Sequence, residues 1–492
     1  MTEEQVKPGK LIAAAALVLG LLGDQLLRAG PWGLNAAIWA GLLALILWLS
    51  LPGSGGAARR RWLPGVVAGF ALLFAWHDSI PLKLLNVAGI AGALALLSAG
   101  RPGPTLRVLS FMEYLFELVA IGLSCFVGPI FLLARDIDWS GIGQTARSAR
   151  LFSLARGLAI ALPILVVFGA LFVSADAAFE NFINTIFDID LASLFLHLFF
   201  TGFFSWIAAG YLRRVFVRSE LRIESFAMPA RASLGITEVA LVLGSLNLLF
   251  LTFVIVQMGY LFGGAHVVSS TPDLTLAEYA RRGFFELIAA GALTLPLLLG
   301  GHWLLRKERP SHESIFRWMA ALLILLVLVV MASAAHRLVL YGREFGVTEQ
   351  RIYAGVFMAW LAAVLAWFCL TVLRGRRERF TTGAVLLGFA ALLCLHLANP
   401  DSLIVRINSA RSSEGKRFDP KYLTSLSLDA VPEMIQALPS YKTEDRKVIA
   451  RYLLEECLRR EQEDWRTWSL AKNSALALIR ERQDDLRGMI AK

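Results

Sequence analysis

The chain has 492 residues, of which 57% are hydrophobic and 17% are charged, and its formal net charge is +10. A soluble globular chain carries about a quarter charged residues, so this composition excludes an ordinary water-soluble protein. The positive charge does not indicate a nucleic-acid-binding protein, because the arginines lie in short loops between long apolar runs. Loops of that kind are typical of the cytoplasmic side of membrane proteins.

The apolar runs are long enough to cross a bilayer, since about 20 helical residues span roughly 30 Å of hydrocarbon. We therefore predict an all-α fold, a polytopic transmembrane helical bundle of about twelve spans with a small soluble helical C-terminal domain. The expected spans are residues 11–27, 34–51, 63–76, 80–97, 111–133, 158–173, 191–212, 236–262, 284–305, 319–340, 356–373 and 384–397.

These runs divide the chain into four predicted parts. The parts are N-terminal transmembrane helices at 1–134, a basic amphipathic loop at 135–157, the main transmembrane helical domain at 158–398 and an extramembrane helical C-terminal domain at 399–492. In the last part, charge is dense and apolar residues recur every four positions at Ile449, Leu453 and Cys457. This recurrence indicates an amphipathic helix packed on a small core.

The basic loops predict the orientation of the spans. The arginine-rich loops expected in the cytoplasm lie at residues 59–61, 213–222, 306–309 and 374–377. Two more basic loops flank the run 111–133, so this run either lies on the surface or re-enters, or one span is miscounted. With the later loops taken as decisive, the C-terminal domain is expected outside the cytoplasm.

Polar and ionisable side chains inside a span are costly and are therefore candidates for function. The candidates for a polar membrane site are Asp176, Glu238, Asn247, Gln257, Tyr279, Arg281 and Glu286. Plainer interpretations stay open. Glu286 follows Arg282 by four residues and can pair with it at a helix start, and Asp176 ends a span where outer water can solvate it.

A second candidate site is the junction between the last span and the tail. It contains Asn399, Asp401 and Arg406. The proline at 400 ends the helix, and Asn or Asp can cap or turn the chain there, so a structural junction and a polar site are both open. Further upstream, His77 and Asp78 occupy the turn of a two-span hairpin, where a solvated turn is expected.

Motifs of catalysis and metal binding are missing from the sequence. The histidines are scattered, and there is no H-E-x-x-H pattern, C-x-x-C pair, Walker loop, G-x-S-x-G or dinucleotide fingerprint. We predict no metal and no cofactor and assign no catalytic residue. A nucleotide-driven pump and a lipase-type hydrolase are disfavoured.

Three stretches of the chain resemble one known family. They are Ser174-Ala175-Asp176 with Phe179, the segment from Glu278 to Leu287, and Asn399-Pro400-Asp401 followed by Asn408, Asp419, Tyr422 and Leu423. Over residues 158–429 they resemble a bacterial multi-pass family known only as a domain of unknown function, number 4173, close to number 4153. The resemblance implies a multi-pass protein of the bacterial cytoplasmic (inner) membrane, and it implies no activity.

Three functions are compatible with these observations. The first is a non-enzymatic membrane sensor or scaffold, whose partners are the lipid bilayer and a protein that binds the C-terminal domain. The second is a secondary transporter that uses buried acidic residues. The third is a membrane enzyme acting on a lipid-linked substrate, which would gather Asp176, Arg281 and Asp401 at one interfacial site.

Overall fold

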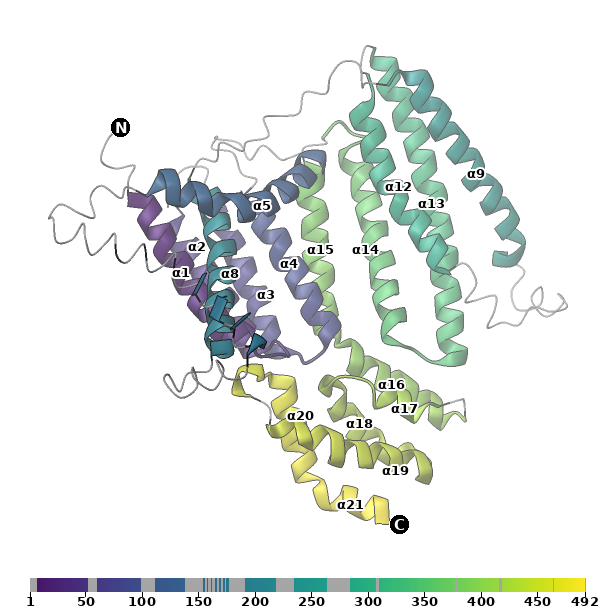
Figure 1. Ribbon diagram of the computed structural model, residues 1–492. Coiled ribbons are helices and arrows are strands. Elements are labelled where there is room, and N and C mark those ends of the chain that lie inside the picture. Colours follow the sequence, from purple (N-terminus) through teal and green to yellow (C-terminus); the bar gives the residue numbers. More distant parts are fainter. Residues whose placement is uncertain are drawn as a thin grey trace. The chain divides into compact units, whose positions relative to one another are not determined.

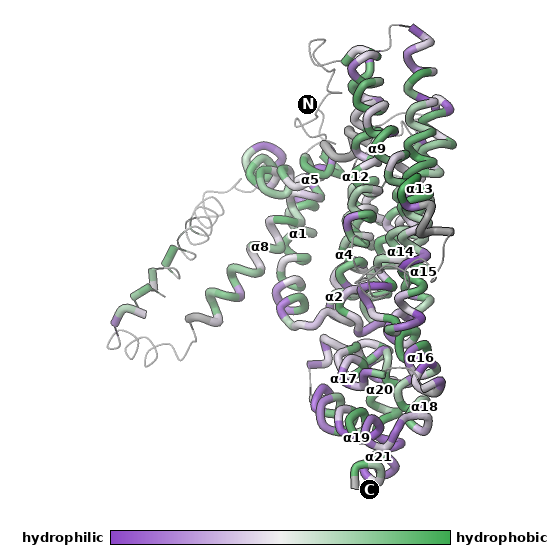
Figure 2. Tube along the Cα trace, turned by 90° about the vertical axis from the view of Figure 1, so that its right-hand side faces the viewer, coloured by the Kyte–Doolittle hydropathy of each residue, from purple (hydrophilic) through white to green (hydrophobic). Residues whose placement is uncertain are grey.

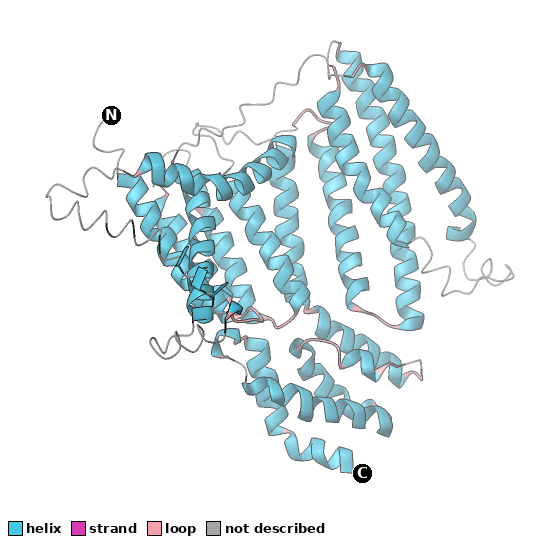
Figure 3. Ribbon diagram, in the orientation of Figure 1, coloured by secondary structure: helices cyan, strands magenta, loops and turns pink. Residues whose placement is uncertain are grey.

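The computed structural model describes residues 7–51, 60–98, 111–137, 191–217, 234–262, 284–306, 309–376, 379–415, 418–462 and 464–491, with scattered positions between 154 and 176. Within these ranges the regular elements are all helices (Figure 3), and extended backbone pairs in one isolated bridge, between Leu234 and Leu305. The predicted all-α fold is confirmed.

The chain forms two compact units, one of Met1–Leu72 and Phe116–Ile223 and the other of Leu73–Leu115 and Glu224–Lys492. The helices of the first unit are α1 (Lys7–Leu27), α2 (Leu34–Ser50), most of α3 (Trp62–Trp76) and of α5 (Phe111–Phe131), the π-helical turn η3 (Leu132–Asp136) and α8 (Leu191–Phe216). In this unit α1 packs along both α2 and α8.

Helix α5 crosses α8 and does not run along it (Figure 1). The side chains and carbonyls of α5 and η3 that hydrogen-bond to α8 are spread from Glu117 to Asp136. Their partners on α8 all lie between Trp206 and Arg214. A long stretch of one helix therefore meets a short stretch of the other. By length and composition Glu117–Asp136 could span a membrane, but the crossing favours the predicted alternative of a surface-lying helix.

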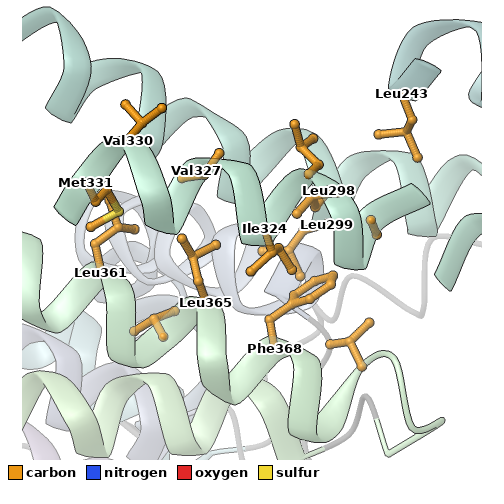
Figure 4. Packing of buried hydrophobic residues seen from close by; sticks show 14 of the residues in the cluster. Leu243, Leu298, Leu299, Ile324, Val327, Val330, Met331, Leu361, Leu365 and Phe368 are labelled. Atoms are coloured by element: carbon orange, nitrogen blue, oxygen red, sulfur yellow. The ribbon is translucent and has the colours of Figure 1, made fainter. Parts of the chain in front are cut away.

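The second unit contains a bundle in which six helices run side by side (Figure 1). They are α4 (Ile80–Ser98), α9 (Ile236–Phe262), α12 (Phe284–Leu304), α13 (Pro310–Phe345), α14 (Glu349–Thr371) and α15 (Phe380–Ala398). Five of them, α9, α12, α13, α14 and α15, contribute to one core, where Val327 packs against Leu365 (Figure 4). Other large side chains face outward, including Leu241 at 73% and Trp318 at 75% exposed. Outward apolar side chains on this scale suit a hydrocarbon surrounding.

Nine helices in the described ranges are long and apolar enough to cross a membrane, and Leu34–Ser50 and Trp62–Trp76 are shorter apolar helices. Figure 2 shows their hydrophobic character against the mixed polarity of the C-terminal helices. These helices make the chain a multi-pass membrane protein. The expected span at 158–173 falls mostly outside the described residues, so the number of spans stays a prediction.

The last ninety or so residues form short helices that gather at one end of the bundle (Figure 1). They are α16 (Pro400–Ser413), α17 (Pro420–Leu423), η7 (Leu428–Ala430), α18 (Val431–Ala437), η8 (Leu438–Ser440), α19 (Thr443–Tyr452), η9 (Leu453–Cys457), η10 (Leu458–Gln462), η11 (Trp465–Thr467), α20 (Leu470–Glu481) and α21 (Gln483–Ala491). The predicted stripe Ile449, Leu453 and Cys457 is fully buried in their core. We refer to residues 399–492 as the C-terminal domain, whose boundaries remain predicted.

Candidate functional site

Buried polar side chains join the C-terminal domain to the helix ends within the second unit. We call this set the junction network, and its members are His77, Asp78, Ser79, Asn86, His396, Asp401, Ser427 and Asp429. All of them are buried except Ser427, which is half-buried. Polar groups so shielded from water must find partners in the protein.

Asp429 is the centre of the junction network. His77 Nδ1 lies 2.6 Å from its Oδ1, and the backbone N–H groups of Asp78 and Ser79 donate to its Oδ2 at 2.7 and 2.9 Å. Ser427 Oγ donates to the same oxygen at 3.0 Å. Burial opposes the charged form of Asp429, but the bond and charge of His77 and the other donors outweigh burial and lower its pKa. The carboxylate also occupies the N-terminal end of α4, where a helix favours negative charge.

Asp401 is held beside Asp429 by the same serine. The Ser427 hydroxyl contacts Oδ2 of both carboxyls, yet it has one proton and can donate to one of them only. Burial raises the pKa of Asp401 to about 7, and the Glu349 and Asp429 carboxylates add to the effect. The backbone N–H of Ser427 also donates to Asp401 Oδ2, at 3.3 Å, so the one serine holds the two carboxyls side by side.

The hairpin turn between α3 and α4 is buried by the C-terminal domain. Asp78 lies 3.4 Å from Lys83 Nζ and 3.2 Å from Nη1 of Arg460, a C-terminal-domain residue. The expectation of a solvated turn at His77 and Asp78 is therefore wrong, because Asp429 and Arg460 cover it and leave His77 2% exposed. The local sequence does not show which distant segment packs on the turn.

The junction network extends into the bundle through His396. Its Nε2 lies 2.7 Å from Asn86 Oδ1, and its ring centroid lies 5.1 Å from that of His77. Hydrogen bonds and ring contacts thus connect Asp401 to α15. A bulky substrate has no access to His77, and in the described ranges no group of three His, Cys, Asp or Glu residues could hold a metal. The arrangement is suited to fixing one geometry and to holding protons.

A second attachment ties the α13–α14 turn to the C-terminal domain. The Asn408 side chain accepts from Val347 N at 2.8 Å and donates to Val347 O at 2.9 Å, and Tyr422 Oη accepts from Glu349 N at 2.8 Å. Gly346 has φ +83°, and an added Cβ would lie 2.6 Å from Asn408 Oδ1. Only glycine fits this turn without strain.

The predicted junction residues take different roles. Asn399 caps α16 in the left-handed conformation, with φ 44°, and its Oδ1 accepts from Ser402 N at 3.4 Å. Asp401 belongs to the junction network, whereas Arg406 is exposed on α16. The structural interpretation fits Asn399, and a polar site at Asp401 stays a prediction.

Two of the membrane candidates link α9 to α13. Asn247 Nδ2 donates to Met319 O at 3.0 Å, and Gln257 Oε1 accepts from Ser333 Oγ at 2.9 Å. Each of these side chains is neutral and makes one hydrogen bond across the helix pair. They serve helix packing, as polar side chains commonly do in membrane bundles.

The two candidate glutamates lie at helix starts and are exposed. Glu238 is in the first turn of α9 and accepts from Gly235 N, which is the reciprocal bond of a helix cap. Glu286 is in the first turn of α12. Neither carboxylate is buried within the bundle.

The remaining candidates are not brought into any described site. Asp176 is exposed and belongs to the first unit. Tyr279 and Arg281 lie outside the described residues, as does Arg282, the predicted partner of Glu286. The interfacial site expected for a lipid-linked substrate is therefore untested.

Sequence reasoning missed Asp429 and the role of His77. The two residues are 352 positions apart, so no local pattern links them. The available signal was the His-Asp-Ser triplet in a turn between two apolar runs, a costly place for ionisable groups that lack a partner.

Comparison with known proteins gives one match. A family profile described as Domain of unknown function (DUF4153) matches residues 64–437. The resemblance noted from the sequence is to family 4173, with 4153 as its close relative, and it is 4153 that matches. The match begins well before residue 158, so it includes the His77 hairpin as well as Asp429. No curated protein and no solved structure matches the chain.

Proposed function

We propose that this chain, which belongs to the DUF4153 family, is a non-enzymatic sensor or scaffold of the bacterial cytoplasmic membrane. Membership of the family does not itself assign an activity. Its C-terminal domain responds to the membrane helices and binds a partner protein. The observation that carries this proposal is the burial of Asp429, a C-terminal-domain residue, against the N-terminal end of α4.

The hydrogen bonds of Asp429 support coupling between α4 and the C-terminal domain, because they are either all formed or all broken. A shift of α4 by a few ångströms would leave a buried carboxylate and two backbone N–H groups without partners. Separating a buried, hydrogen-bonded charge from its partners costs about 3–5 kcal/mol. The attached state therefore dominates at rest, and a stimulus that moves α4 biases a two-state element.

The proposed position of the C-terminal domain is outside the cytoplasm. Its contacts are with the α3–α4 turn and the α13–α14 turn, while Arg306 and Arg309 begin α13 at the far end of that helix and Arg376 and Arg379 lie beyond the far end of α14. Basic residues are more numerous at that far end than at the α13–α14 turn, where Arg343 and Arg351 are accompanied by two glutamates, and the more basic loops mark the cytoplasmic side. A surface-lying α5 would also bring both of its flanking basic loops to that side.

Two single-cysteine substitutions test on which side of the membrane the C-terminal domain lies and whether it binds a partner protein. Gln436→Cys is on the exposed surface of α18, and Ser311→Cys is the matched control on the basic end of α13. The native Cys457 is buried, which raises its thiol pKa to about 11, so it is replaced by alanine in both variants. Intact cells receive a membrane-impermeant, thiol-reactive photocrosslinker. We expect Gln436→Cys to label and to crosslink a discrete protein, and Ser311→Cys to label only after permeabilisation.

The same crosslink measures coupling. Adding Asp429→Asn should change the crosslink yield several-fold, whereas Glu444→Gln, which removes an 86% exposed carboxylate, should not. Equal yields in both backgrounds would contradict the coupling. Solute or proton flux in liposomes containing the purified protein, abolished by a junction-network substitution, would favour the transporter instead.

A further inference from the structure

A pocket of about 690 Å³ opens where α13 ends, α14 begins and α16 passes both. Val339, Ile352 and Val356 contribute to its apolar walls. Its volume is in the range of sites that hold small molecules, roughly 300–1,000 Å³. All its lining residues lie in the described ranges of the second unit, and none belongs to the junction network.

Three arginines line this pocket, at positions 343, 351 and 411. Arg411 donates through Nε to Arg343 O at 3.1 Å and through Nη2 to Glu344 O at 2.6 Å, and Arg351 donates to Gly346 O. Carbonyls at the end of α13 thus fix two guanidiniums, each of which keeps further N–H groups. Among the lining residues the acid is Glu414, so the pocket is net positive.

Two of the three arginines flank the ends of apolar runs, the positions where hydrocarbon gives way to headgroups around a membrane-spanning helix. Arg343 follows the apolar run 319–340 by three residues, and Arg351 precedes the run that starts at Val356. The Arg351 guanidinium also stacks over the Tyr341 ring at 4.2 Å, an aromatic residue typical of this zone. Val339, 51% exposed, continues the apolar wall onto the outer face of α13.

We propose that this pocket binds the phosphate headgroup of an anionic phospholipid, with one acyl chain along the apolar wall. A guanidinium matches phosphate with two parallel N–H bonds. Three guanidiniums around one pocket favour a headgroup with net negative charge over a zwitterionic one, in which an ammonium balances the phosphate. The mixed lining separates this occupant from a soluble anion, which would gain nothing from Val339 and Val356. The inference goes beyond the proposed function and does not rest on it.

Lipid titration of the purified full-length protein tests the assignment. Protein in neutral detergent is titrated with short-chain phosphatidylglycerol, with phosphatidylcholine of equal chain length and with inorganic phosphate, and bound lipid is counted by native mass spectrometry. The variants are Arg343→Gln, whose side chain is exposed, and Arg406→Gln, an equal charge loss at an exposed position of α16 that does not line the pocket. Thermal unfolding controls for folding.

The expected result is a preference of about tenfold for phosphatidylglycerol over phosphatidylcholine, lost in Arg343→Gln and kept in Arg406→Gln. Arg343→Lys should keep part of this preference, because lysine retains the positive charge but lacks the two parallel N–H donors of the guanidinium. Equal binding of the two lipids, or equal loss in both glutamine variants, would overturn the proposal. If millimolar inorganic phosphate displaced bound phosphatidylglycerol as strongly as added phosphatidylglycerol does, the occupant would be a soluble anion and not a lipid.

Discussion

Between α9 and α13 the buried polar groups are neutral and meet in single pairs, whereas in the junction network they are ionisable and share partners. Gln257 has the Ser333 hydroxyl, but Asp429 has His77 and the backbone of a helix end besides Ser427. The bonds that Asn247 and Gln257 make across this helix pair join an amide to a carbonyl or a hydroxyl, and such neutral groups are less costly to bury than charges. At helix ends the free N–H groups stabilise a carboxylate.

The largest effect is expected from removing Asp429. Asp429→Ala leaves His77 and two backbone N–H groups unpaired in a buried site, so it should destabilise the second unit by about 3–5 kcal/mol. The measurement is thermal unfolding of the purified protein in detergent. Glu444→Ala, at an exposed site in the same domain, is the control. Equal unfolding temperatures for the two variants would show that the contact carries no stability.

Asp401 should give an intermediate, pH-dependent effect. Its pKa is raised to about 7 in the folded chain by burial, above the ordinary value of about 3.9, so the folded state binds the extra proton between these pH values. The stability that this group contributes is fully present below about pH 4, falls as pH rises and is lost above about pH 7. The total loss in the free energy of unfolding is at most ~4 kcal/mol.

Asp401→Asn removes that titration. It should stabilise the protein at pH 8 relative to the unmodified chain and bring no gain at pH 4.5, measured by unfolding temperature at both pH values. The lowered pKa of Asp429 acts in the opposite sense, since its stabilisation is lost only as pH falls below about 4. A benefit of Asp401→Asn that is the same at both pH values would contradict the raised pKa of Asp401.

The smallest effect is expected between α9 and α13. A double-mutant cycle of Gln257→Leu and Ser333→Ala should give a coupling of about 0.6 kcal/mol, the average for hydrogen bonds between membrane helices. Thr252→Ala, which removes a hydroxyl bonded within α9 itself, should not couple to Ser333→Ala. A coupling of several kcal/mol would mean that this pair belongs to a charged or functional site, and the contrast with Asp429 would fail.

Local pattern was enough to predict the helices. Apolar length identified α9, and the four-residue recurrence identified the buried stripe of Ile449 and Cys457, since both depend on neighbours in sequence. The candidate sites fared unevenly because burial depends on distant segments. Glu238 looked costly inside an apolar run but caps the helix at its start, and His77 looked solvated but is covered by Asp429.

The separation of His77 and Asp429 also sets an order of events during synthesis. At about 5–20 residues per second, the segment that carries Asp429 leaves the ribosome about 20–70 s after the α3–α4 hairpin, with 352 positions between the two contact residues. During that interval the hairpin turn has only water to satisfy its N–H groups. Completion of the junction network therefore waits until Asp429 has been synthesised, and a chain that stops before that residue keeps an open, polar turn.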